Sequence, residues 1–409
     1  MMSLTLLMGC PEQQPPPWPP QTAPSNNPDD WEVDSSVTYT HGFSEVRWVV
    51  PSEALPHETP VYASNNNVGI HFFEDRLFLG WRTAPTHFAG EDTILYVISS
   101  DDQGATWEHE LTVALGADAR EPLFYDFGGV LYFLYFEAGT NPYSFDPVAM
   151  KRHRRLGKGA WSGGETWGEP EEVPWDIRQR DGKIYLSSYL GNHYESGPSD
   201  IQVRFTVSTD GHTFHPVSGD SAVVYRGGVS EASFQFTADG DLWAVLRNED
   251  GDASGFGSLL CFAPAEDLSA WDCPTQSNPE RYDSPRLLRH GHDLYLIARR
   301  DIGGPFDQGR DDLTDEEKKL QYLVDYWNRP KRTALYRVDT NARTIIHLED
   351  LPSAGDTAFP SIRRTDTHTF LVANYTSPVD DPDRTWIEGQ GAVDGTQIYL
   401  LDLRFSPQD

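Results

Sequence analysis

Positive charge is scarce in this sequence of 409 residues: 32 Lys and Arg stand against 63 Asp and Glu, which gives a formal net charge of −31. Such a field repels a polyanion, so we exclude nucleic acid as a partner. After the N-terminal segment no run of 18 apolar residues occurs, and none is expected to span a membrane. The 13 His show no metal-ligand spacing such as HExxH, and we expect neither a metal nor another cofactor.

Cysteine is also rare, with only 3 in the chain. The start "MMSLTLLMGC" places Cys10 after a short apolar run and before a Pro-rich stretch, as in a bacterial lipoprotein signal. We expect residues 1–10 to be this signal, with Cys10 lipidated, and 11–35 to be an extended tether. The predicted location is therefore the bacterial cell envelope, periplasm or surface, with a lipid as the only membrane contact. A chance apolar start is the alternative, because the run is short and no Lys or Arg precedes it.

The other two cysteines lie in "LLCFAPAEDLSAWDC", which indicates two strands around a short loop. In an exported chain this arrangement favours a cross-strand disulfide between Cys261 and Cys273. Two free buried thiols are the alternative.

Aromatic residues are abundant, and one pattern repeats along the chain: an extended run, a turn and an apolar-aromatic strand. The first apolar residues after the six turns are Leu77, Val130, Ile184, Leu242, Leu294 and Phe370. The spacing is close to fifty residues until the last interval. There "LTDEEKKLQYLVDYWNRP" carries a capping box, Thr314 with Glu317, which predicts an inserted helix within 311–330.

Further strand-like segments between these hairpins predict about four strands per unit. Residues 36–409 are therefore predicted to form an all-β, six-bladed β-propeller with one inserted helix. The last unit stops near Phe405, one strand short. The segment "SEVRWVV", residues 44–50, is expected to supply the missing strand and close the ring.

The stretch from Ser100 to Trp107 has the spacing S-x-D-x-G-x-T-W and stands between two expected strands. An Asp carboxylate accepts backbone N–H bonds in such a turn, Gly104 allows a positive φ, and Trp107 buries a large ring. We interpret the motif as architectural. "STDGHTF" at 208–214 repeats it one residue shorter.

These Asp boxes in a sixfold repeat resemble the sialidase superfamily over roughly residues 60–405. The match is best in "GVSEASFQFTADGDLWAVLRNEDGD", where the resemblance makes Glu231 a catalytic residue and Arg247 a substrate-binding one. Hairpin symmetry supports this pair independently, since both side chains emerge opposite the turn at Asp239. The same symmetry relates Asp283 to Arg299 and Phe359 to Tyr375.

One face of the propeller should therefore collect Glu231, Arg247, Asp283, Arg299 and Tyr375. The resemblance also suggests Asp92 as the acid, with an exposed loop carboxylate as the alternative. Two positions depart from sialidases. "NNNVGI" stands where the first triad Arg is expected, so that Arg82 or Arg120 would have to substitute, and Phe359 takes the place of the nucleophilic Tyr. Tyr375 on the neighbouring strand is the candidate catalytic tyrosine in its place, with a packing role as the alternative.

Two functions remain. The first is a surface-anchored glycosidase acting on an acidic sugar, with Glu231 as base or stabiliser, Asp92 or Asp283 as acid, and arginines binding the anionic group. The second is a non-catalytic propeller that binds a glycan or a protein through the same face. In either case we expect a monomer with a glycan or glycoconjugate as its partner.

Overall fold

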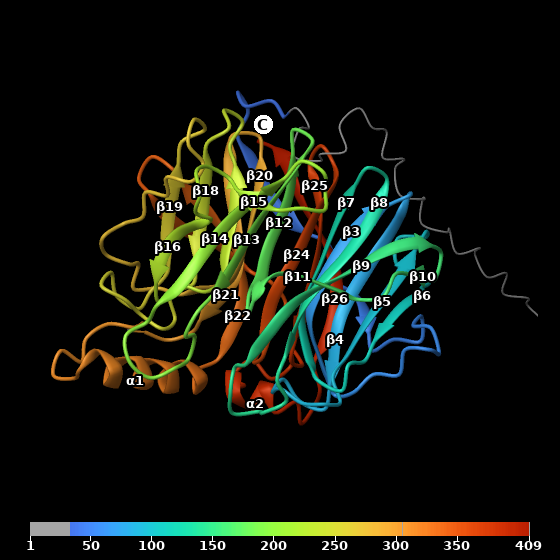
Figure 1. Ribbon diagram of the computed structural model, residues 1–409, viewed down its shortest axis with the longest axis horizontal. Coiled ribbons are helices and arrows are strands. Elements are labelled where there is room, and N and C mark those ends of the chain that lie inside the picture. The colour runs from blue at the N-terminus through green and yellow to red at the C-terminus, as the bar shows by residue number, and fades with distance from the viewer. Residues whose placement is uncertain (1–32, 305, 409) are drawn as a thin grey trace, which may run out of the picture.

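The computed structural model describes residues 33–304 and 306–408, which form six antiparallel sheets around one axis (Figure 1). The predicted signal segment, Cys10 and most of the tether lie outside the described residues. The first sheet contains β3 (Ser64–Phe73), β4 (Arg76–Ala84), β5 (Ile94–Ser100) and β6 (Glu108–Val113). The second contains β7 (Asp118–Phe127), β8 (Val130–Ala138), β9 (Pro147–Gly157), β10 (Ala160–Trp161) and β11 (Glu165–Pro170). The prediction of a six-bladed β-propeller is confirmed.

The remaining sheets follow in chain order. The third contains β12 (Val173–Arg180), β13 (Lys183–Leu190), β14 (Ile201–Ser208), β15 (His215–Pro216) and β16 (Val223–Gly227), and the fourth β17 (Ala232–Phe236), β18 (Leu242–Leu246) and β19 (Leu259–Ala263). The fifth contains β20 (Tyr282–His290), β21 (Asp293–Asp301), β22 (Lys331–Asp339) and β23 (Thr344–Asp350), and the last β24 (Thr357–Asp366), β25 (Thr369–Thr376) and β26 (Gln397–Pro407).

The N-terminal strands close the ring. β1 (Tyr39–Phe43) and β2 (Arg47–Val50) both pair antiparallel with β26, so the last blade is built from both ends of the chain. The closing strand expected from residues 44–50 is therefore present as β2. The innermost strands β3, β7, β12, β17, β20 and β24 each contact the next around the axis, and layers of buried apolar side chains fill the space between neighbouring blades.

Five of the six inner strands carry a β-bulge near their start, where the pairing shifts by one residue. In four of them a non-glycine residue of the bulge has a positive φ, at a cost of about 1–3 kcal/mol each. These residues are Asn67, Glu121, Ser284 and Phe359. β17 pairs with β18 in continuous register, without a bulge. The predicted pairing of Phe359 with Tyr375 is wrong. The bulge in β24 shifts the register, so that Ala358 lies opposite Tyr375.

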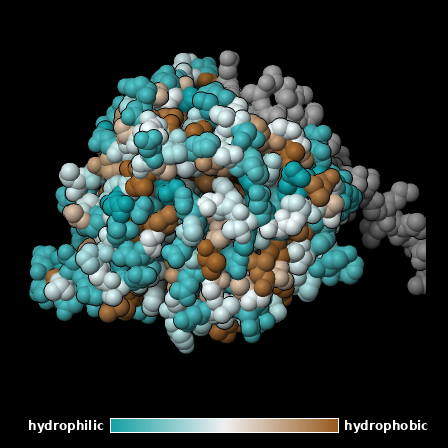
Figure 2. All heavy atoms as spheres, in the orientation of Figure 1, coloured by the Kyte–Doolittle hydropathy of each residue, from teal (hydrophilic) through white to brown (hydrophobic). Residues whose placement is uncertain are grey.

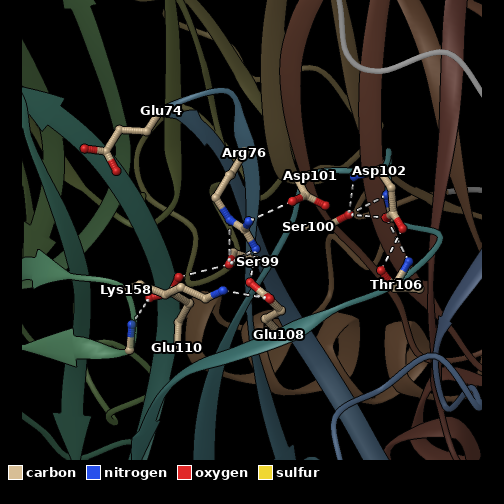
Figure 3. Close-up of polar contacts among 12 residues, drawn as sticks. Glu74, Arg76, Ser99, Ser100, Asp101, Asp102, Thr106, Glu108, Glu110 and Lys158 are labelled. Atoms are coloured by element: carbon tan, nitrogen blue, oxygen red, sulfur yellow. Dashed lines mark hydrogen bonds and ion pairs between the residues drawn. The ribbon is translucent and has the colours of Figure 1, made fainter.

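The turn from Ser100 to Trp107 joins β5 to β6 at the rim of the first blade (Figure 3). Asp102 Oδ1 accepts hydrogen bonds from the backbone N–H of Thr106 and from Ser100 Oγ, both at 2.8 Å. Gly104 has a φ of 83°, and Trp107 is buried. Beside this turn Glu108 pairs with Lys158 at 2.8 Å, which links the rim of the first blade to the second (Figure 3). These contacts stabilise a turn far from the axis.

The described residues form two helices, rather than the single one predicted, and both lie at the same end of the propeller (Figure 1). α1 (Asp315–Trp327) has the expected capping box of Thr314 and Glu317. α2 (Trp386–Gln390) follows β25, and its five residues are too few to show a helical period in the sequence. The rings of Tyr326 and Trp386 pack edge to face with centroids 5.0 Å apart. None of the described helices is long and apolar enough to cross a bilayer.

The fourth sheet has only three strands, fewer than the four predicted. Residue 272 lies beside β19 in an isolated bridge, in which Phe262 and Asp272 exchange backbone hydrogen bonds of 3.0 and 2.7 Å. Next to this bridge a disulfide joins Cys261 to Cys273, with the Cα atoms 4.3 Å apart. The disulfide thus holds a short segment where the fourth strand would lie.

Hydrophilic residues cover most of the face seen in Figure 2, with apolar side chains only scattered among them.

Replacing both cysteines, as Cys261→Ala with Cys273→Ala, should lower the free energy of unfolding by about 3 kcal/mol. The disulfide closes a loop with a sequence separation of 12, and this constraint on the unfolded chain would be lost. Urea unfolding measures the difference. Equal unfolding midpoints for the double variant and the wild type would contradict this assignment.

Candidate active site

A cavity of about 530 Å³ lies at the end of the propeller that carries α1 and α2. Both helices contribute to its wall, together with the starts of inner strands and the loops after β4, β8 and β13. Its aromatic side chains are Phe88, Tyr143, Phe145, Tyr189, Tyr194, Trp327, Phe359 and Trp386. Its ionisable side chains, other than tyrosine, are His87, Asp118, Arg120, Glu121, Asp146, His193, Glu231, Arg247 and Arg299. This size and this mixed lining are typical of small-molecule sites.

Glu231 lies immediately before β17 and lines the cavity, but both of its oxygens are engaged. Arg247 Nη1 donates to Oε1 at 2.7 Å, and the backbone N–H of Ser284 donates to Oε2 at 2.7 Å. The hairpin symmetry that predicted the Glu231–Arg247 pair thus corresponds to a real contact. These donors suit an ionised carboxylate that is held in place.

Arg247 belongs to a buried network of charges. Its guanidinium contacts Glu231, Glu249 and Asp283, and these carboxylates raise its pKa well above the ordinary value although burial acts to lower it. Arg281 joins the same network through Glu249 at 3.1 Å. Because carboxylates of the protein surround Arg247, it serves here to hold Glu231.

Asp283 lies in this network and not in the cavity wall. Its carboxylate is 3.4 Å from Arg247 Nε and 3.5 Å from Arg281 Nε. Burial acts to raise its pKa, but the arginines dominate and lower it. An Asp that is kept ionised and enclosed in this way is unsuited to donate a proton to a substrate.

Glu121 is an acidic residue of this cavity that the sequence analysis missed. It sits in the bulge of β7 with a φ of 57°, and the Asn67 side-chain amide donates to its Oε1 at 3.1 Å. Burial, and then the negative charge of Glu231, raise its pKa to about 8, against the opposing charges of Arg286 and Arg120. One cavity is therefore lined by a carboxyl group whose environment favours the protonated form at neutral pH and by a salt-bridged one.

Arg299 was predicted to bind an anionic group together with Arg247, and Arg82 or Arg120 to substitute for the missing triad arginine. Arg299 lines the cavity: its Nε donates to the Thr357 carbonyl at 2.8 Å, and its Nη2 has no hydrogen-bond acceptor within the described residues. Arg120 also lines it, paired with Asp118 at 2.5 Å. Arg82 is fully buried against the same Asp118 at 2.9 Å, outside the cavity lining.

Of the remaining predicted residues, Asp92 and Tyr375 lie outside the cavity lining and Phe359 belongs to it. Asp92 is exposed in the turn before β5. Tyr375 is fully buried, and its hydroxyl donates to Asp356 Oδ1 at 2.9 Å. Burial raises its pKa well above the ordinary value, which disfavours the phenolate that a nucleophile needs. Phe359 lines the cavity from the bulge of β24, with its ring 5.2 Å from that of Trp175.

Two histidines of the cavity wall each face a buried carboxylate. His87 Nδ1 is 2.7 Å from Asp356 Oδ2, and His193 Nδ1 is 3.0 Å from Asp250 Oδ1. The His193 ring is stacked on Tyr194, with centroids 3.7 Å apart, and packs edge to face against Phe145. In the part of the chain that the structure describes, no group of three His, Cys, Asp or Glu side chains could hold a metal ion.

Comparison with known proteins gives solved structures only. No family model and no curated protein matches this sequence. A protein of unknown function from Dyadobacter fermentans superposes with a TM-score of 0.59 at 14% identity, over 90% of this chain and 99% of its own. A mutant of Trypanosoma rangeli sialidase displaying trans-sialidase activity gives 0.52 at 10% identity, over 89% of this chain and 58% of its own.

The Penicillium chrysogenum alpha-L-arabinanase, complexed with arabinobiose, superposes with a TM-score of 0.50 at 11% identity, over 88% of this chain and 98% of its own. The chain therefore has the six-bladed propeller fold seen in sialidase and arabinanase structures. Identities this low establish the fold and leave the activity to be argued from the cavity.

The raised pKa of Glu121 makes stability depend on pH in a testable way. The folded protein retains a proton that the unfolded chain releases between pH 4.5 and about 8, so the free energy of unfolding should fall as pH rises through this window. Glu121→Gln should reduce this fall by up to about 5 kcal/mol. Urea unfolding at several pH values tests this, with the exposed Glu45→Gln as control. Parallel curves for wild type and Glu121→Gln would refute the assignment.

Proposed function

We propose that this protein is a glycoside hydrolase acting on glycans that carry an anionic sugar. The observation that carries the proposal is the pair Glu121 and Glu231 in one cavity, with the proton held by Glu121. Acid-assisted cleavage of a glycosidic bond requires two carboxyl groups, one protonated and one ionised, and different environments create this difference. Glu121 donates its proton to the leaving oxygen, and Glu231 stabilises the positive charge that develops on the sugar ring.

The anionic part of the substrate is proposed to bind at Arg299 and Arg120. Arg299 lines the cavity with Nη2 lacking an acceptor, and a permanently charged guanidinium suits a sugar carboxylate. The Arg299 guanidinium also lies 4.7 Å from the centre of the Trp386 ring, which helps to hold it in the cavity wall. A local cationic site is needed because the protein as a whole repels anions.

A non-catalytic glycan-binding propeller is the second candidate. The buried positions of Arg247 and Tyr375 favour it, since two residues that the sialidase resemblance offered for chemistry are occupied by other side chains of the protein. In this case the aromatic side chains of the cavity and Arg299 bind the sugar, and no bond is cleaved.

An exported, lipid-anchored location is also proposed, on the N-terminal sequence pattern. The Cys261–Cys273 disulfide supports export, because structural disulfides persist in oxidising compartments.

The central test is hydrolysis of fluorogenic sialyl and uronyl glycosides by the full chain. Wild type should turn over at least one, and Glu231→Gln should lower kcat about 10²–10⁴-fold. Glu121→Gln should lower kcat by the same factor on alkyl glycosides. On aryl glycosides its kcat should fall much less, because their leaving groups need little protonation. Asp239→Asn, in the exposed turn at the far end of the β17–β18 hairpin, is the control.

Two results would contradict this account. If wild type cleaves no glycoside but binds one, the protein is a binding propeller. If Asp92→Asn abolishes turnover while Glu121→Gln does not, then Asp92 is the acid that the sialidase resemblance implied.

Anion binding is tested by comparing charged and neutral substrates. Arg299→Gln should raise KM for an anionic glycoside about tenfold or more, because a hydrogen bond to a charged group is lost, and should change KM for the neutral analogue little. Equal effects on both substrates would show that Arg299 supports the cavity wall without binding the anion.

A further inference from the structure

We propose that His87 is the base of this site: its Nε2 accepts a proton from the water that attacks the glycan. This inference rests on the proposed hydrolase function and assigns a residue that no sequence motif indicated.

The first argument is the way His87 is held. It lies in the loop between β4 and β5, and its backbone N–H donates to the Gln390 carbonyl of α2 at 3.0 Å. Arg120 Nη2 donates to its carbonyl oxygen at 2.7 Å. The side chain is fixed as well, because Nδ1 lies 2.7 Å from Asp356 Oδ2. A residue held from three sides in a loop is pre-organised for proton transfer.

The second argument is the state of Asp356. It is fully buried, and its other oxygen, Oδ1, accepts hydrogen bonds from Tyr375 at 2.9 Å and from Trp386 Nε1 at 3.1 Å. Burial acts to raise its pKa, but the hydrogen bond with His87, the charge of Arg299 and the hydrogen bond from Tyr375 lower it. Two groups face Nδ1: the Asp356 carboxylate at 2.7 Å and the Asn66 amide nitrogen at 3.3 Å. The ionised carboxylate is the closer partner and can only accept, so His87 carries its proton on Nδ1.

The third argument is the position of Nε2. His87 lines the cavity with Glu121, and Nε2 has no hydrogen-bond partner within the described residues. Burial lowers the pKa of the ring, and Arg120 and Arg82 lower it further against the opposing charge of Asp356. With Nδ1 protonated, a neutral ring presents a lone pair on Nε2, as a base oriented by a carboxylate does in other hydrolases.

The fourth argument is that Glu231 is poorly placed to be the base. Its two oxygens are held by Arg247 and by the Ser284 N–H, both at 2.7 Å. Taking up a proton would break a salt bridge inside the charge network. Its ionised form suits the role of stabilising positive charge, which leaves proton removal to another group.

The resulting step balances. The water oxygen bonds to the anomeric carbon while one of its protons moves to His87 Nε2. The bond from that carbon to the glycosidic oxygen breaks, and the leaving oxygen takes the proton of Glu121. The site is left with a His87 imidazolium and a Glu121 carboxylate, and the proton returns through solvent before the next turnover.

The test uses the full chain and the fluorogenic acidic glycoside that wild type cleaves. His87→Ala should lower kcat about 10²–10⁴-fold, and added imidazole should restore a large part of it. His87 sets the acidic limb of the pH profile of kcat/KM in wild type. In the rescued variant this limb should instead follow the pKa of the added imidazole. Thermal unfolding verifies that the variant folds, and His87→Gln, which fills the site without a base, should stay inactive.

His193→Ala is the matched control, because His193 also faces a buried carboxylate but its ring is stacked on Tyr194. If the His193→Ala variant loses activity, added imidazole should not restore it. Wild-type kcat in His87→Ala, or a loss that imidazole does not rescue, overturns the base assignment and leaves the hydrolase proposal standing. A wild-type protein that cleaves none of the glycosides overturns both.

Discussion

The site depends on the β-bulge near the start of the inner strands. Each bulge adds one residue to the strand, and in four blades a residue of the bulge, none of them a glycine, is in the left-handed region. This strained backbone places Glu121 and Phe359 in the cavity wall and brings the Asn67 amide to Glu121. The exception, β17, has no bulge, and there Glu231 stays in register with Arg247. Strain of this kind concentrates at functional sites because a regular ladder would aim the side chains elsewhere.

Electrostatics then differentiates the two carboxyl groups. Arg247 and Arg281 neutralise a set of buried acids that includes Glu231, while Glu121 receives mainly an amide hydrogen bond and no salt bridge. Burial therefore favours the protonated form of Glu121, while Glu231 in the same cavity is held by a salt bridge to Arg247. His87 and Asp356 add a neutral ring next to an ionised acid on the side of α2. A protein with a net charge of −31 thus contains a cavity in which a carboxyl group of raised pKa, a carboxylate-paired imidazole and buried arginines are each held by local contacts.

The propeller, the closing strand and α1 were predictable because a repeat of about fifty residues and a capping box are local signals. The Glu231–Arg247 pair was predictable because an unbulged hairpin preserves its symmetry. The Phe359–Tyr375 pair was wrong because a bulge shifts the register, and Glu121 was missed for the same reason. A signal exists in the sequence: Glu121, Ser284 and Phe359 are each followed by Pro, a residue that cannot continue a central strand. What no pattern contained was the long-range meeting of His87 with Asp356, 269 residues apart.

The most direct test of the account is the protonation state of Glu121 in the folded protein at neutral pH. Infrared difference spectroscopy between wild type and Glu121→Gln detects a buried carboxylic acid through its carbonyl stretch, which a carboxylate lacks. The account predicts a protonated band in wild type that is absent in Glu121→Gln and disappears as pH rises past about 8. A carboxylate band in its place at neutral pH would show that Glu121 is ionised, and the cavity would then contain no acid to protonate a leaving group.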